Sequence, residues 1–85
     1  MPYAIPRRLQ KTLPQHPNPP ANCDHCAGAV GDVFYDMRTK SGLWANLCAR
    51  CALDGVGCGR TGEGHGQKYV RRPNSPDKAF RKMEG

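Results

Sequence analysis

The chain lacks a long hydrophobic run. Its 85 residues are 38% hydrophobic and only 7% aromatic, with 10 glycines and 8 prolines. Residues 1–8 contain no apolar core of the kind found in secretory signals. A small chain with so few large apolar side chains seldom gains enough burial energy to fold alone. These absences predict one small domain with tails, a cytoplasmic setting and no membrane segment.

The sequence also lacks a recognisable catalytic set. His16, His25 and His65 have no evident acid-base partner, and no group of nucleophile, base and orienting residue can be assembled. Residues 57–62 match the glycine pattern of dinucleotide-binding proteins, but they follow a cysteine pair instead of joining a strand to a helix. We therefore expect a protein that is not an enzyme and has no small-molecule substrate.

Acidic residues are absent from residues 1–22, and the formal net charge of the chain is +6. The excess positive charge lies in the tails, because residues 23–51 are balanced. Basic tails indicate a polyanionic partner, although they also occur simply to keep small proteins soluble. We predict nucleic-acid contacts from the basic residues Arg7, Arg8, Lys11, Arg60, Lys68, Arg71, Arg72, Lys78, Arg81 and Lys82.

Four of the five cysteines form two Cys-x-x-Cys pairs, Cys23 with Cys26 and Cys48 with Cys51. Two such pairs complete a tetrahedral site, so we predict one structural Zn²⁺ held by four thiolates. Iron would accept the same four sulfurs, whereas disulfides need an oxidising compartment that nothing here indicates. Cys58 has the wrong spacing for a third pair and is interpreted as a small apolar residue or a free thiol.

The segment between the cysteine pairs is typical of a β-hairpin. Residues 30–37 are rich in strand formers, residues 38–42 resemble a hairpin loop, and residues 43–47 form the return strand. The predicted fold is therefore a small zinc ribbon stabilised by its metal. Alternating side chains place Phe34 on one face of the first strand and Val33, Tyr35 and Met37 on the other.

The aromatic residues of this hairpin have two interpretations. Trp44 is expected to cover the metal end of the core, because a large apolar ring excludes water from thiolates. The alternative is that Trp44, Phe34 or Tyr35 is exposed and stacks on a base of a nucleic acid.

The N-terminal arm comprises residues 1–22. A short amphipathic helix is predicted from apolar residues spaced four apart, Ile5, Leu9 and Leu13. Residues 14–20 are rich in proline and predict an extended spacer.

The ribbon domain is assigned to residues 23–69 and includes a glycine-rich wrap at residues 55–66. The glycines either allow a tight turn around the domain or expose N–H groups for an anion. A basic C-terminal arm follows at residues 70–85. Its Ser75-Pro76-Asp77 sequence predicts the start of a short helix, with Phe80 and Met83 on the apolar face.

Residues 23–69 resemble small zinc-ribbon proteins of tailed bacteriophages, particularly those that infect actinobacteria. The resemblance lies in Cys23-Asp-His-Cys26, Trp44-Ala-Asn-Leu-Cys48-Ala-Arg-Cys51, Gly55-Val-Gly and Gly62-Glu-Gly-His-Gly-Gln67-Lys-Tyr69. It implies a zinc-ribbon fold and a bacterial host cytoplasm, but no mechanism.

Two functions remain open. The first is a non-enzymatic zinc-binding module that docks through its basic arms on RNA, DNA or a ribonucleoprotein such as the ribosome. The alternative is a modulator that binds a host protein machine, such as RNA polymerase, through the ribbon face.

Overall fold

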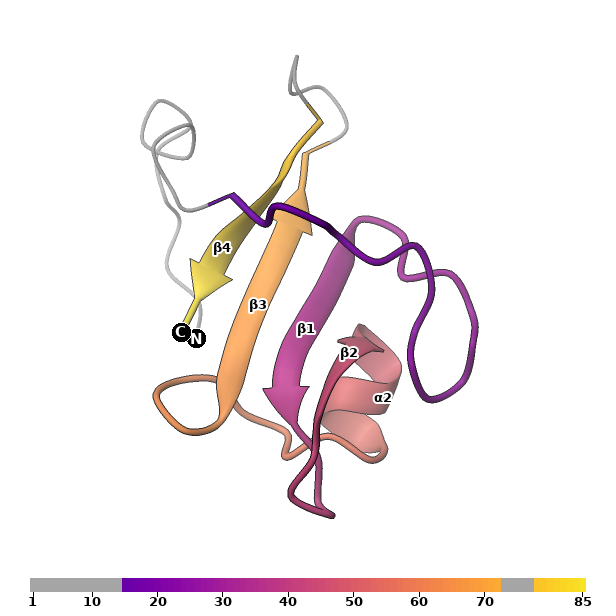
Figure 1. Cartoon of the computed structure of the whole chain (residues 1–85), viewed down its shortest axis with the longest axis vertical. Coiled ribbons are helices and arrows are strands. Elements are labelled where there is room, and N and C mark those ends of the chain that lie inside the picture. Colours follow the sequence, from indigo (N-terminus) through magenta and orange to yellow (C-terminus); the bar gives the residue numbers. More distant parts are fainter. Residues whose placement is uncertain (1–14, 73–77) are drawn as a thin grey trace.

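The computed structural model describes residues 15–72 and 78–85, which form a four-stranded antiparallel sheet and one short helix (Figure 1). The strand order is β2-β1-β3-β4. The elements are β1 Val33–Arg38, β2 Trp44–Cys48, α2 Ala49–Asp54, β3 Gly66–Arg71 and β4 Phe80–Glu84. The helix predicted around Ile5, Leu9 and Leu13 lies outside the described residues.

The predicted hairpin is formed by β1 and β2, with bounds slightly C-terminal to those predicted. Phe34 lies opposite Cys48 at one end of this strand pair, and Arg38 lies opposite Trp44 at the other. The turn is held by the Thr39 hydroxyl, which donates to the backbone oxygen of Leu43 at 2.7 Å. β2 ends at Cys48, so the hairpin carries this cysteine directly to the cysteine cluster described below.

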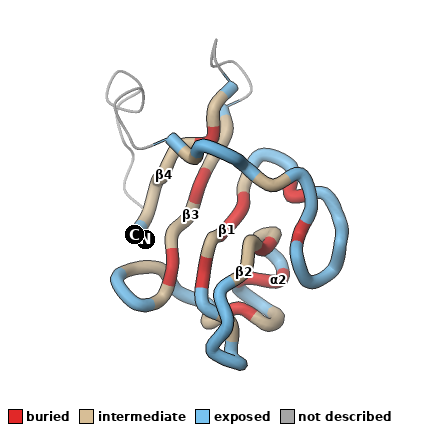
Figure 2. The backbone as a smooth tube through the Cα atoms, viewed as in Figure 1, coloured by how far each residue is buried: buried red, intermediate tan, exposed pale blue. Residues whose placement is uncertain are grey.

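β1 is a central strand, because β3 pairs along its other edge. Much of β1 is buried (Figure 2). Its residues Phe34 and Met37 point to opposite faces of the strand, and both are completely buried. Met37 lies directly opposite Gly66, where a side chain would overlap Met37 itself. The glycine at the start of β3 therefore allows the third strand to approach β1 closely.

One face of the sheet carries the aromatic cluster, defined as His16, Phe34, Tyr69 and Phe80. The rings of Phe34 and Tyr69 are stacked with centroids 5.1 Å apart, and Phe80 meets Phe34 edge to face at 5.0 Å. His16 meets both Phe34 and Tyr69 edge to face. Burial raises the pKa of the Tyr69 hydroxyl, as does the nearby Asp36 carboxylate to a smaller extent. This cluster joins three strands and the N-terminal segment into one core.

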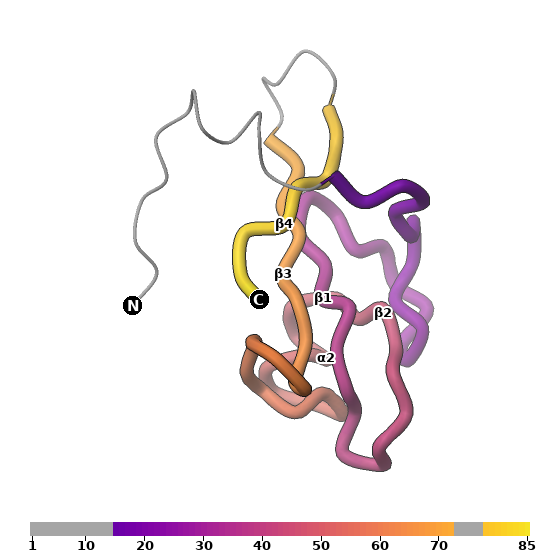
Figure 3. Tube along the Cα trace, turned by 60° about the vertical axis from the view of Figure 1, so that its left-hand side comes forward, coloured from indigo at the N-terminus to yellow at the C-terminus, as the bar shows by residue number. Residues whose placement is uncertain are grey.

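The opposite face of the sheet is covered by α2 and the loop that follows it (Figure 3). Leu47 and Ala52 are fully buried there with Met37. The backbone at Gly57 leaves no room for a side chain against Ala52 and the Met37 sulfur. Part of the glycine-rich segment is thus required by close packing around the domain, as one of the two interpretations proposed. The short helix was not predicted from the sequence.

The C-terminal segment differs from its prediction, because Phe80–Glu84 form strand β4 instead of a helix. β4 pairs with β3, with Arg71 opposite Phe80, and Phe80 is only 4% exposed. Phe80 and Met83 are three residues apart, a spacing that suits a helix, but pairing with β3 overrides this local pattern. The predicted helix start at residues 75–77 lies outside the described residues.

Residues 15–20 do not act simply as a spacer. The backbone N–H of His16 donates to the Phe80 oxygen at 3.0 Å, and Gln15 forms an isolated bridge with Arg81. The chain then crosses the sheet on the side of the aromatic cluster (Figures 1 and 3). This segment, called the strap below, supplies the His16 ring to the core. Proline still keeps the strap extended, but packing fixes its position.

Candidate metal centre

The second cysteine pair spans the junction between β2 and α2. Cys48 is the last residue of β2 and the N-cap of α2, with extended backbone angles of −66° and 162°. Cys51 follows in the first turn of the helix. A strand-to-helix turn lets two side chains three residues apart face the same point. Local backbone structure therefore sets the direction of both sulfurs.

The first cysteine pair lies in a tight loop. The N–H of Ala27 donates to the Cys23 oxygen at 3.0 Å, and the N–H of Cys23 donates to the Gly28 oxygen at 2.8 Å. Ala27 adopts a positive φ of 63° to close this turn. Two further N–H groups point at the sulfurs, from His25 to Cys23 Sγ and from Gly28 to Cys26 Sγ, each at 3.4 Å.

The two cysteine pairs are joined by Asp24 and Asn46. The N–H of Asp24 donates to the Asn46 oxygen, and the N–H of Asn46 donates to Asp24 Oδ2, both at 2.8 Å. Asn46 lies on the outer edge of β2, so its backbone groups are free of the β1 ladder. This reciprocal contact sets the first loop beside the sheet edge. Nothing in the cysteine spacing indicated it.

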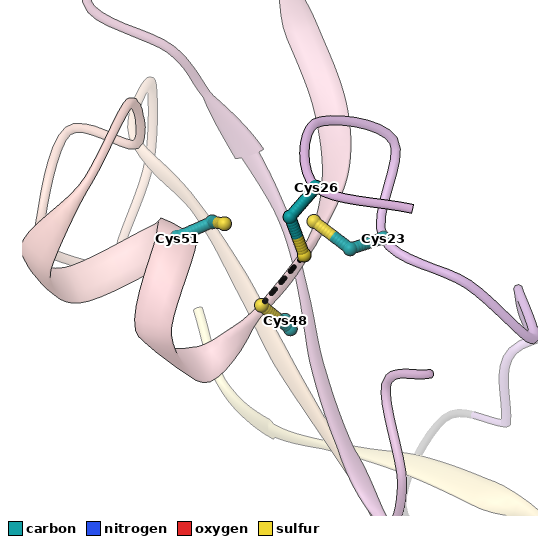
Figure 4. Close-up of side chains that lie close together, drawn as sticks. All are labelled: Cys23, Cys26, Cys48 and Cys51. Carbon is teal, nitrogen blue, oxygen red and sulfur yellow. Dashed lines mark hydrogen bonds between the residues drawn. The ribbon is translucent and has the colours of Figure 1, made fainter. Parts of the chain in front are cut away.

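The four sulfurs converge on one point (Figure 4). All four Sγ atoms lie within 4.8 Å of one another, and those of Cys26 and Cys48 are 3.9 Å apart. A tetrahedral ion with Zn–S bonds of about 2.3 Å needs sulfurs about 3.8 Å apart. The four cysteines are therefore positioned to bind one metal ion with little adjustment.

The surroundings of the cluster lower the pKa of one cysteine thiol and raise the pKa of another. Burial opposes ionisation of Cys23, but N–H groups of Cys26, Cys48 and His25 outweigh it and lower the pKa of this thiol to about 6. Burial, with the sulfurs of the other cysteines, raises the pKa of Cys51 to about 12. A divalent cation resolves this conflict, because it compensates four close thiolates at once.

Cys58 lies outside the cluster of four cysteines. Its Sγ donates to the backbone oxygens of Arg60 and His65, each at 3.4 Å, and the residue packs against the core. It thus behaves as a half-buried thiol within the glycine-rich loop.

Trp44 does not cover the metal end of the core, which corrects the expectation from the sequence. It is 55% exposed and lies at the opposite end of β2 from Cys48. The four-residue separation along an extended strand places its Cα atom about 14 Å from that of Cys48. The error came from treating nearness in sequence as nearness in space.

Among the described residues, the cations predicted to contact nucleic acid are spread over β3, β4 and the neighbouring loops. Lys68 and Arg71 lie on β3 and contact acids: Lys68 Nζ is 3.9 Å from Glu84, and Arg71 pairs with Asp32 at 3.0 Å. The Arg71 guanidinium also stacks over the Phe80 ring, at 5.0 Å from its centroid.

Of the other predicted cations, Arg81 and Lys82 are half-buried on β4, whereas Arg60, Arg72 and Lys78 are exposed. The predicted contacts at Arg7, Arg8 and Lys11 lie outside the described residues. Arg38 and Lys40, which are not among the predicted contacts, are exposed at the β1–β2 turn.

Within the described part of the chain, no helix is long and apolar enough to cross a membrane. Comparison of the sequence and structure with models of protein families, curated proteins and solved structures finds no match.

Proposed function

We propose that the protein is a non-enzymatic zinc-binding module that binds nucleic acid through basic residues on its sheet and arms. The proposal of a zinc-binding module rests on the four converging cysteines. Four thiolates satisfy a tetrahedral zinc ion completely and leave no position for water or substrate. A closed site of this kind stabilises a fold instead of catalysing a reaction.

The proposal of nucleic-acid binding rests on the charge of the β3–β4 hairpin. Its described residues, 66–72 and 78–85, carry six lysines and arginines but only one acid, Glu84. The strands hold these cations in fixed positions on the sheet. The basic residues of the N-terminal arm add further to the net positive charge of the chain. Such a surface attracts the phosphates of RNA or DNA.

Binding to labelled RNA and DNA over a range of salt concentrations tests this proposal. Each phosphate contact that releases a counterion adds about 0.7–0.9 to the slope of log K against log salt. Lys78→Ala and Lys82→Ala should each lower the slope by about one contact. Arg50→Ala, which removes an exposed cation from α2, should leave it unchanged.

The competing hypothesis is a modulator that binds a protein machine. Capture from a bacterial lysate, with and without nuclease, separates the two. Loss of captured material after nuclease treatment supports the nucleic-acid proposal. Retention of a protein partner, together with a shallow salt dependence, would replace it with the protein modulator.

A further inference from the structure

The β1–β2 turn carries two large apolar side chains in solvent. Leu43 is 73% exposed and Trp44 is 55% exposed. Single exposed apolar residues are common on proteins, but these two are adjacent and lie beside the exposed cations Arg38 and Lys40. We call Arg38, Lys40, Leu43 and Trp44 the hairpin tip.

Arg38 and Trp44 lie side by side on the same face of the hairpin. They are directly opposite in the strand register. The backbone groups of Arg38 bond to His65 and Cys58 on its other side, so this is the closer, non-hydrogen-bonded kind of cross-strand pair. The Arg38 guanidinium also reaches the turn. Its Nη2 lies 4.0 Å from the point where a Cβ atom would stand if Gly42 had a side chain.

The tip is held in a fixed conformation before anything binds. The Thr39 hydroxyl contacts both Ser41 and Leu43, and the N–H of Gly42 donates to the Thr39 oxygen. The N–H of Lys40 donates to the Val56 oxygen at 2.8 Å, which ties the turn to the loop after α2. A partner therefore meets an ordered surface and loses little affinity to ordering it.

The charge of the tip selects the partner. No acidic residue occurs between Asp36 and Asp54 in the sequence, and the side chains of Arg38 and Lys40 make no ion pair with any described residue. The negative charge expected at the cysteine centre lies about 14 Å along the strand, beyond the screening length of about 8 Å at physiological ionic strength. Asp36 lies two residues from Arg38 on the same face of β1, so the tip and its neighbour together carry two cations and one acid, and the tip keeps a net positive charge beside an aromatic ring.

We propose that the hairpin tip binds single-stranded nucleic acid, with an unpaired base stacked on the Trp44 indole and the adjacent phosphate contacted by Arg38. An exposed ring next to a cation matches one nucleotide, which presents a flat base and an anionic phosphate. This inference rests on the proposed function and specifies that the protein recognises single-stranded nucleic acid and not a duplex. A duplex keeps its bases stacked on one another, so it offers the tip only phosphates.

Trp44 is the single tryptophan of the chain, so its fluorescence reports the proposed contact directly. Titration of the metal-loaded full chain with short oligo(dT) and oligo(U) should quench this fluorescence, whereas a duplex of equal length should change it little. Binding without any change in tryptophan emission would overturn the inference while leaving the proposed function intact.

Variants complete the test, with binding measured by anisotropy of labelled oligo(dT). Trp44→Ala should weaken binding roughly 5- to 150-fold, as expected for loss of one stacked base. Arg38→Ala should lower the salt slope by about 0.7. The matched control is Leu53→Ala, because Leu53 is 53% exposed but lies on α2. Metal content and thermal unfolding verify that each variant is folded.

The outcomes separate the two proposals. Equal affinity of folded Trp44→Ala and wild type would mean that the sheet and arms bind without the tip. Failure of the wild-type protein to bind any nucleic acid would remove the proposed function and this inference together. Equal losses in Trp44→Ala and Leu53→Ala would also overturn the inference, because the effect would not be specific to the tip.

Discussion

The cysteine centre and the aromatic cluster adjoin the same strand, β1, but they are held by different physical forces. Around the cysteines the side chains are small, Cys26 is exposed, and the four sulfurs repel one another when ionised. In the aromatic cluster, Phe34, Tyr69 and Phe80 bury their rings against each other. One region is therefore arranged to bind a metal ion, whereas the other is held by burial of apolar surface.

This difference suggests that the two regions lose stability for different reasons. The loop of the first cysteine pair contains no large buried apolar side chain other than Val30 at its end. The sheet made by β1, β3 and β4 has the larger rings and continuous strand pairing.

Removing the metal should have the largest effect. Structural zinc contributes an apparent free energy of about 10–16 kcal/mol in small zinc domains. After chelation, amide hydrogen exchange should rise first in residues 23–28 and α2, while amides of β1 and β3 keep more protection. Cys51→Ser should reproduce this result, and Cys58→Ser should retain the metal. Simultaneous loss of protection in both regions would show that they unfold as one unit.

Phe80→Ala should destabilise the aromatic cluster by about 3–5 kcal/mol, the usual cost of removing a buried phenylalanine. Thermal unfolding measures the loss, and metal analysis at low temperature should still find one ion per chain. Met83→Ala is the matched control, because Met83 is only half-buried on the same strand. An unchanged unfolding temperature for Phe80→Ala would mean that β4 contributes nothing to the core.

Gly66→Ala should cost about 1–3 kcal/mol, because the added methyl overlaps Met37 and lies 2.7 Å from its Cα atom. Gly64→Ala is the control: its φ of 78° also favours glycine, but no atom lies within 4 Å of the added methyl. The difference in unfolding free energy between the variants reports the overlap with Met37 together with the greater backbone strain of alanine at the Gly66 φ of 151°. Equal values would show that β3 shifts away from β1 without penalty.

Asp24→Ala should have the smallest effect, about 1 kcal/mol, because it removes one exposed hydrogen bond to the Asn46 N–H. The readout is the rate at which a chelator extracts the metal, which should increase, since the first loop is held less firmly beside β2. Asp24→Asn keeps an acceptor oxygen and should restore most of the original rate. An identical increase in both variants would point to the charge instead of the hydrogen bond.

Much of the cysteine centre was predictable, because its determinants are local. Each Cys-x-x-Cys pair encodes its own turn, and the strand pattern with a short loop encodes the hairpin that brings the pairs together. The contact between Asp24 and Asn46 was not predictable, since it joins residues 22 apart through a backbone edge with no sequence signature.

The C-terminal strand shows the opposite case. Residues 78–84 contain apolar and basic residues in a pattern that suits a short helix, and a short segment has little intrinsic preference that outweighs its surroundings. Gly66–Arg71 offers an unpaired edge, and pairing with that edge also buries Phe80. Tertiary contacts therefore decided the secondary structure of this segment.

The cluster of four cysteines, the hairpin between the cysteine pairs and the excess of positive charge could be predicted from the sequence alone, because each depends on residue type and short spacing. Three other features emerge only in the folded chain: β3 and β4 complete the sheet, His16 joins the core and Trp44 stays in solvent. These features depend on which distant segments reach the two faces and edges of β1. Packing between segments far apart in the chain is set by the whole set of competing contacts, and no local pattern contains that information.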